Sequence, residues 1–281
     1  MKRQNITGFI LCVALFGLGF FLNGNLNLYF NLSGLLIVFG GTFGATLLSF
    51  KTAQLAIVRK VLWSSYNRPV NNETEIINIL IDLSIRSRAD GILTLQQHEN
   101  KTTVYFLRRA LGCLVDGYKP EQIRDILNTE MYFFRLRRED SERVLRSIAE
   151  FFPSFGIIGS VVGLITMLGG IGDTSTILRA IPIALTSTLY GLIFSNFFFL
   201  PFAANLKERT NHELLLQKII MEGVISIQSE MNPVILKTKL ESFLTPSDRE
   251  TKLVSYEKIR ERFKIEKEQV KDKAFDLYLD D

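Results

Sequence analysis

The chain has 281 residues, which is enough for one or two domains. Its net charge of +4 is too small to indicate a nucleic-acid partner, and 47% hydrophobic residues stand beside 22% charged ones. Such a mixture suggests that very apolar segments alternate with ordinary charged ones. The two cysteines and two histidines show no spacing typical of a disulfide or a metal site, so we expect neither metal nor nucleic acid.

Four apolar runs approach the roughly 20 residues that a transmembrane helix needs. The first covers about 6–22, and a polar loop follows it where a signal peptide would need a small-residue cleavage site. The second covers about 32–50, the third about 151–171 and the fourth about 180–203. We therefore expect an all-α, polytopic membrane protein with four transmembrane helices and a helical cytoplasmic domain.

Lysine and arginine are distributed unevenly around these runs. The loop 23–31 contains none and the loop 172–179 contains only Arg179, whereas the segments on the other side of the runs are rich in them. The positive-inside rule places those rich segments and both termini in the cytoplasm. The expected organisation is a transmembrane hairpin over 1–50, a helical cytoplasmic insert over 51–150, a second hairpin over 151–203 and a helical cytoplasmic tail over 204–281.

Helical periodicity supports this view of the cytoplasmic parts. Apolar residues recur at i, i+3 and i+4 over 73–88, 105–115 and 121–148. Pro120 indicates the first turn of a helix, because proline is favoured at that position. In the tail, we expect Asn232-Pro233 to interrupt a helix.

The interiors of the four apolar runs contain no Asp, Glu, Lys, Arg or His. A protein that carries protons across a bilayer normally needs a titratable group within it. If this chain moves ions, a second polypeptide must therefore supply a carboxylate. The sequence also lacks a nucleophile–base group and a G-x-x-x-x-G-K-[ST] phosphate-binding motif, so we do not expect an enzyme.

Small residues recur at helical spacing in the apolar runs. Gly159 and Gly163 form a GxxxG pair, a pattern that lets membrane helices approach closely, and Gly40 and Gly44 form another. We expect helix packing to involve Gly156, Gly159, Gly163 and Gly191. The small stripe of the fourth run consists of Ala184, Thr188, Gly191 and Ser195.

Hydroxyl groups accompany these small residues. Ser160 lies at the centre of the third run. Thr186, Ser187 and Thr188 are consecutive in the fourth run, so they cannot all share one packing face. The simplest explanation of each single hydroxyl is a hydrogen bond to the carbonyl four residues earlier.

Two segments, FPSFGIIGSVVGLITML (152–168) and AIPIALTSTLYGLIFSNFFFLPFAANLKER (180–209), resemble the paired final helices of the MotA/PomA family, the stator channel subunits of the bacterial flagellar motor. Three more segments resemble cytoplasmic stretches of that family. They are SRADGILTL (87–95), VDGYKPEQIRDILNTE (115–130) and NPVILKTKLESFLTPSDR (232–249). The resemblance covers nearly the whole chain, in the same order.

The resemblance implies a multi-pass protein of the bacterial inner membrane that couples ion flow to torque. Five copies would surround two copies of a MotB-like, peptidoglycan-binding partner, whose single membrane helix carries an ion-binding Asp. Sodium-driven members tend to have Thr at the position of Ser160, and proton-driven members tend to have a small residue such as Ala. This favours H⁺ and leaves Na⁺ open, with no cofactor besides the transported ion. The residues implied to line the ion pathway are Ser160, Thr186, Ser187 and Thr188.

Pro153 and Pro201 match the two functional prolines of the family, at the cytoplasmic ends of the third and fourth runs. Each proline removes a helix hydrogen bond, which would make a hinge there. The alternative from local sequence is that each proline simply ends its helix.

The resemblance also implies contact between the cytoplasmic insert and a FliG-like rotor protein. Arg88 matches the family's principal basic residue, but Gln96 stands where the family has Glu. The other charged candidates nearby are Arg86, Asp90 and Glu99. Three alternatives to a flagellar stator are an ExbB/TolQ-type energiser of outer-membrane processes, a gliding-motility motor subunit and a purely structural membrane scaffold.

Overall fold

The computed structural model describes residues 11, 14–15, 17–22, 24, 29–67, 72–95 and 104–245. Helices make up most of these residues, and there is no strand among them, which confirms the all-α expectation. The first apolar run, 6–22, falls only in part on the described residues, as does the loop that follows it.

The described residues form two compact units, and each is taken by itself. The first draws on Met1–Asn71 and Tyr118–Met221, and the second on Asn72–Gly117 and Glu222–Asp281. These units follow contacts within the chain rather than the position of a membrane. The boundaries expected near residues 50, 150 and 203 therefore remain predictions.

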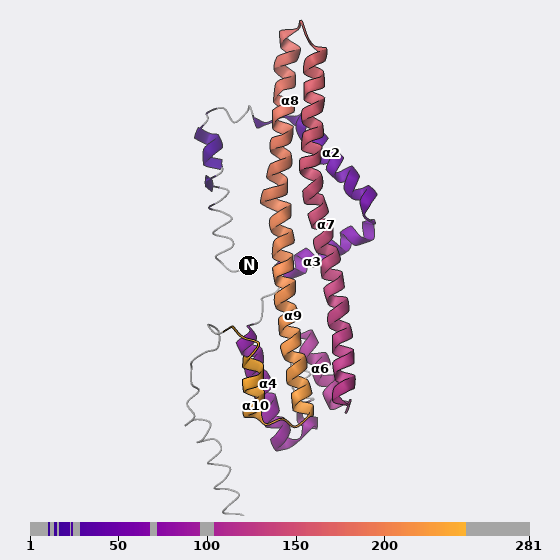
Figure 1. Ribbon diagram of the computed structural model, residues 1–281, viewed down its shortest axis with the longest axis vertical. Helices are drawn as coiled ribbons and strands as arrows, with labels where there is room; N and C mark the ends of the chain where they lie inside the picture. Colours follow the sequence, from indigo (N-terminus) through magenta and orange to yellow (C-terminus); the bar gives the residue numbers. More distant parts are fainter. Residues whose placement is uncertain are drawn as a thin grey trace, which may run out of the picture. The chain divides into compact units, whose positions relative to one another are not determined.

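Two long helical stretches dominate the first unit. Helix α7 (Pro120–Gly169) pairs with α8 (Thr174–Ile193), which continues through the π-helical segment η3 (Phe194–Phe199) into α9 (Leu200–Gln228). Figure 1 shows α7 and α8 side by side, with α2 (Leu32–Ser49) against both. Helix α3 (Thr52–Asn67) follows α2 and packs on α7.

Three described helical stretches are long and apolar enough to cross a membrane. They are Leu32–Ser49, Pro120–Gly169 and Thr174–Gln228, and they contain the second, third and fourth of the apolar runs. As expected, Pro120 occupies the first turn of α7. The third and fourth runs are parts of longer helical stretches, because α7 begins at Pro120 and α9 ends at Gln228.

A tight turn joins α7 to α8. Gly172 has φ +106°, a value that favours glycine. Asp173 caps α8: its carboxylate accepts hydrogen bonds from the Ser175 backbone N–H (3.0 Å) and the Thr176 hydroxyl (2.6 Å). The Thr176 and Ser175 hydrogen bonds hold the pKa of Asp173 below its ordinary value, because they stabilise the charged form.

Glycines set the distance between α7 and α8. A Cβ on Gly163 would lie 2.6 Å from the backbone nitrogen of Ala184, and a Cβ on Gly191 would lie 2.5 Å from the carbonyl oxygen of Phe152. Gly156 also faces α8, with its virtual Cβ 3.4 Å from the Cα of Gly191. The two backbones therefore touch directly, as small-residue membrane interfaces allow.

Helix α2 is fixed to α8 at its start. The Tyr190 hydroxyl accepts a hydrogen bond from the Asn31 backbone N–H (2.7 Å) and donates one to the Tyr29 carbonyl (2.5 Å). Asn31 in turn caps α2 by accepting the Gly34 N–H at 2.9 Å. Further along, Val38 of α2 is buried in a cluster with Phe152 and Tyr190. By contrast, Gly40 and Gly44 have no atom within 4 Å of their virtual Cβ positions.

The second unit contains α4 (Glu73–Asp90), the 3₁₀ turn η2 (Ile92–Leu95), α6 (Tyr105–Val115), the end of α9 from Glu222, and α10 (Pro233–Glu241). Helix α10 packs on α4, and η2 packs on both α4 and α6. Lys239 of α10 donates to Glu222 Oε2 at 2.8 Å and to Ser226 Oγ at 3.1 Å, which ties α10 to α9. The helical break expected at Asn232-Pro233 is present, because Asn232 caps α10.

The contact at Gly191 predicts a marked difference between two Gly→Ala variants. Gly191→Ala should lower the free energy of unfolding by about 1–3 kcal/mol, because its methyl group meets backbone atoms that cannot move aside. Gly169→Ala should stay within about 0.5 kcal/mol, because nothing lies within 4 Å of its virtual Cβ. Thermal unfolding of the purified protein in detergent measures both. Equal losses would contradict a backbone contact at Gly191.

Candidate functional site

Two hydroxyl groups meet between α7 and α8. Ser160 Oγ lies 2.5 Å from Thr188 Oγ1, and also 2.5 Å from the carbonyl oxygen of Ala184. A third oxygen, the Gly156 carbonyl, is 3.2 Å from Ser160 Oγ. Both hydroxyl-bearing residues are half-buried. Helical spacing on α7 and α8, together with the glycine contacts around them, brings these side chains together.

One arrangement of the protons places a hydrogen bond in each of the two contacts of 2.5 Å. A carbonyl oxygen can only accept, so the single Ser160 hydroxyl proton points at Ala184. Ser160 then accepts from Thr188, whose own proton is used in that bond. Thr188 Oγ1 therefore still has a lone pair with which it can accept a hydrogen bond. In this state the pair offers an acceptor, suited to a cation or to a protonated carboxyl group.

Thr186 and Ser187 lie elsewhere. Their hydroxyls donate to the Pro182 and Ile183 carbonyls of their own helix, each at 2.7 Å, and both side chains are buried. A Cβ on Gly34 of α2 would lie 2.8 Å from Ser187 Oγ and 3.2 Å from Thr186 Oγ1. The four hydroxyls therefore do not form one group: Ser160 and Thr188 meet, and the other two face α2.

Gly159 of α7 faces Ser187 of α8. A Cβ on Gly159 would lie 2.5 Å from Ser187 Cβ. Of the four glycines expected to pack, Gly156, Gly163 and Gly191 face the partner backbone, whereas Gly159 faces a side chain.

Among the described residues, no group of three His, Cys, Asp or Glu could hold a metal ion. The oxygen atoms of the hydroxyl pair are uncharged.

Neither Pro153 nor Pro201 ends its helix. Pro153 lies inside α7, which runs to Gly169, and Pro201 is the second residue of α9, directly after the π-helical segment. The alternative of helix termination is therefore wrong for both. Pro153 has no N–H to offer the Ala149 carbonyl four residues earlier. That carbonyl instead accepts a hydrogen bond from Ser195 Oγ at 2.7 Å.

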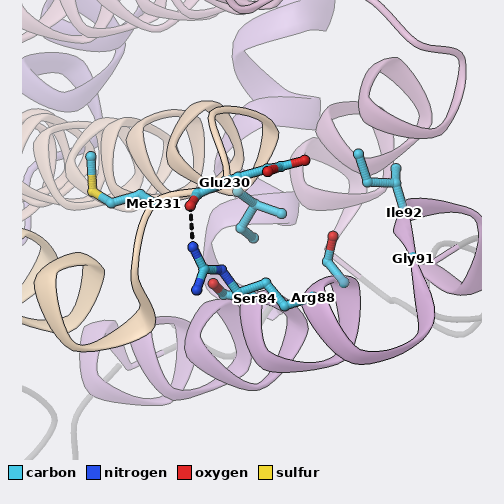
Figure 2. Close-up of a pocket in the computed structure, with 8 residues that line it drawn as sticks. Ser84, Arg88, Gly91, Ile92, Glu230 and Met231 are labelled. Carbon is cyan, nitrogen blue, oxygen red and sulfur yellow. Dashed lines mark hydrogen bonds between the residues drawn. The ribbon is translucent and has the colours of Figure 1, made fainter.

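The second unit contains a pocket of about 460 Å³ beside Arg88. Figure 2 shows the Arg88 side chain reaching the backbone oxygen of Glu230, to which its Nη2 donates. Glu230 has φ 51° and follows the last turn of α9, so Arg88 binds the turn between α9 and α10. The other lining residues are Ser84, Ser87, Gly91, Ile92, Ile227 and Met231.

The remaining candidates for rotor contact are distributed along α4 and beyond it. Arg86 pairs with Asp82 at 2.9 Å on the exposed face of α4. Asp90 is the last residue of α4 and is exposed. Gln96 and Glu99 lie outside the described residues. Rotor contact by this group stays a prediction.

Comparison with known proteins identifies the class to which this architecture belongs. A model of the MotA/TolQ/ExbB proton channel family matches residues 98–218. Motility protein A of Borreliella burgdorferi is 33% identical over 224 residues, which cover 80% of this chain and 86% of that protein. The chemotaxis protein PomA of Vibrio alginolyticus is 28% identical, with 89% of this chain and 98% of that protein covered.

A solved structure shows the same arrangement of helices. The flagellar MotAB stator complex from Bacillus subtilis contains a chain that matches with a TM-score of 0.81 and 26% identity, covering 88% of this chain and 98% of that one. The chain therefore belongs to the MotA/TolQ/ExbB proton channel family. Within that family it is an ion-channel subunit of the flagellar-stator type, a membrane protein and not an enzyme, as the sequence indicated.

The Arg88 contact predicts a structural effect of its replacement. Arg88→Gln should speed hydrogen exchange of the backbone amides at 229–236 by about tenfold, because the turn after α9 loses a charge-assisted hydrogen bond. Arg86→Gln is the matched control, since Arg86 is paired with Asp82 on its own helix. Mass-spectrometric exchange on the purified protein measures both. Unchanged exchange in Arg88→Gln would mean that the contact does not hold the turn.

Proposed function

We propose that this chain forms the wall of a proton path in a flagellar stator and passes the energy of proton flow to the rotor as torque. One observation carries the proposal: Ser160 and Thr188 place two uncharged oxygen groups at 2.5 Å from each other between apolar helices. These hydroxyl groups can form hydrogen bonds with a carboxylate that another chain supplies.

A MotB-like subunit is the partner that supplies this carboxylate. The similar chain from Bacillus subtilis is part of a MotAB stator complex, which supports such a partner here. The partner's single membrane helix would place an Asp beside Ser160 and Thr188. Five copies of this chain around two copies of the partner, in the bacterial inner membrane with both termini cytoplasmic, complete the proposed assembly.

The hydroxyl pair distinguishes the two protonation states of that Asp. A protonated carboxyl group donates, and Thr188 Oγ1 is free to accept from it while Ser160 keeps its bond to Ala184. A charged carboxylate needs a donor, which Thr188 provides only by giving up its bond to Ser160. Each protonation cycle would therefore rearrange the contact between α7 and α8.

The long helices can carry such a rearrangement toward the rotor. Beyond the prolines, α7 and α9 are joined by Arg138, whose Nη2 donates to both carboxylate oxygens of Glu213 at 2.9 and 3.1 Å. The two helices would thus move together on the cytoplasmic side, with Pro153 and Pro201 as the hinge. Arg88, with the charged residues near it, would present this motion to a FliG-like rotor protein.

A flagellar role is favoured over the ExbB/TolQ alternative. The family description includes TolQ and ExbB. However, motility protein A and PomA match this chain over most of their own length. Co-purification separates the two roles: a stator requires a partner with one membrane helix and a peptidoglycan-binding domain, whereas an energiser requires a TonB- or TolR-like one.

Removal of the Thr188 hydroxyl should strongly reduce torque while the complex still assembles. Thr188→Val keeps the side-chain shape, and the lost hydrogen bonds should reduce stator-driven swimming speed at least about tenfold. Thr46→Val is the control, because Thr46 is buried in α2 and donates to the Thr42 carbonyl of its own helix. Swimming of a stator-deficient strain that expresses each variant with the partner provides the measurement. Full motility with Thr188→Val would contradict the proposed path.

Proton specificity gives a separate prediction. Swimming should persist in sodium-free medium at fixed pH, because Ser160 lacks the methyl group of the Thr found in sodium-driven relatives. Motor speed should instead follow the proton-motive force when a protonophore is added stepwise. Stalling in sodium-free medium, reversed by added sodium, would assign the driving ion to Na⁺.

A further inference from the structure

The most informative contact outside the hydroxyl pair lies at Pro153. Because proline has no N–H, the Ala149 carbonyl loses the hydrogen bond that its own helix would provide. Ala149 is 1% exposed, so water cannot easily replace that bond. The carbonyl would be an unsatisfied buried acceptor within α7 alone.

Ser195 supplies the missing donor from the neighbouring helical stretch. Its Oγ donates to the Ala149 carbonyl at 2.7 Å, and Ser195 itself is 3% exposed. Other buried hydroxyls behave differently: Ser141 and Thr210 both donate to the carbonyl four residues earlier in their own helix. Ser195 instead bonds across to α7.

Local geometry makes this cross-helix bond possible. One turn before Ser195, the backbone of Gly191 lies close to α7: its virtual Cβ would be 2.5 Å from the Phe152 carbonyl and 3.1 Å from Pro153 Cα. The serine side chain is short, so it reaches Ala149 only because the helices approach this closely. Glycine and serine thus act together at the proline.

The π-helical segment completes the arrangement. The Leu200 N–H donates to the Ser195 carbonyl, an i→i+5 bond that brings residues five apart nearly into line. Phe194 and Phe199 consequently both pack on Phe152, with ring centroids 5.6 and 5.0 Å away. The residue before Pro153 is therefore held by the same segment that satisfies Ala149.

We propose that Ser195 is a positioning residue, a latch that holds the Pro153 hinge in the conformation seen here by donating to the Ala149 carbonyl. Rotation of the serine side chain toward the Gly191 carbonyl of its own helix releases the latch, and α7 is then free to bend at Pro153. The role of this latch in torque rests on the proposed function. The hydrogen bond itself does not.

A double-mutant cycle tests the latch. Ser195→Ala should lower the melting temperature by about 2–5 °C, because the Ala149 carbonyl is left buried and unpaired. In a Pro153→Ala background the restored N–H satisfies that carbonyl, so Ser195→Ala should lower the melting temperature by less than half as much. Ser141→Ala, the same change at a buried serine that bonds within its own helix, should lower it equally in both backgrounds. Equal losses from Ser195→Ala in the two backgrounds would overturn the proposal.

Infrared spectroscopy gives a direct signature of the carbonyl. Protein labelled with ¹³C=O alanine should show one amide I component that moves to higher frequency in Ser195→Ala. The same substitution in the Pro153→Ala background should lack this shift. Both comparisons add the same labelled alanine at 195, so the difference between them reports Ala149. A shift that is identical in the two backgrounds would also overturn the latch.

Motility separates the latch from the proposed function. Ser195→Ala should reduce swimming speed about three- to tenfold at an unchanged level of protein in the membrane, because bending at Pro153 is no longer coupled to the contact between the helices. Ser195→Thr, which keeps the hydroxyl, should recover more speed than Ser195→Ala. If wild-type protein and partner fail to restore swimming, the flagellar function is wrong. The thermal and infrared results still test whether Ser195 holds the Pro153 hinge. If Ser195→Ala swims at full speed, the latch has no part in torque.

Discussion

The direct contact between the α7 and α8 backbones is the constraint on which the rest of the structure depends. Gly163 and Gly191 permit it, since a methyl group at either position would overlap atoms of the other helix. At this separation a serine and a threonine, with their short side chains, can reach each other and the backbone across the interface. Larger residues would move the helices apart, and the hydroxyl pair and the Ser195–Ala149 bond would be lost together. The chemistry of the site is therefore a consequence of packing.

Local features of the fold could be predicted from the sequence because their causes are local. Pro120 begins α7 and Asn232 caps α10, as their residue types indicate. The glycines of the third and fourth runs indicated that their helices pair closely, whereas Gly40 and Gly44 of the second run have no atom within 4 Å of their virtual Cβ positions. The hydroxyls were different: periodicity shows which residues share a face, but not which neighbour covers that face. The position of α2 shows that Thr186 and Ser187 face that helix.

The contacts of Ser195 and Tyr190 were not predicted from the sequence, because their partners are backbone atoms. Ser195 was visible as a small residue on the stripe of the fourth run, yet its partner is a carbonyl that proline leaves open 46 positions away. Tyr190 ties α8 to the start of α2 through backbone atoms of Tyr29 and Asn31, which no side-chain pattern records. Arg88 was assigned to rotor contact because it matches the principal basic residue of the family, and that role stays a prediction; the contact of its guanidinium with the turn after α9 was not foreseen. Backbone acceptors leave little trace in a sequence, so contacts to them require a structure.

The π-helical segment has a consequence for how the fourth run relates to α9. One wider turn shifts the phase of the helix, so a face that is continuous through α8 points in another direction after Phe199. Residues counted at ordinary helical spacing share one face of the helix up to Ser195, but not beyond it. The parts of this helical stretch before and after η3 can thus contact different neighbours with different faces. Deletion of a single residue within 194–199 would bring the two faces back into phase and turn the whole of α9 about its axis.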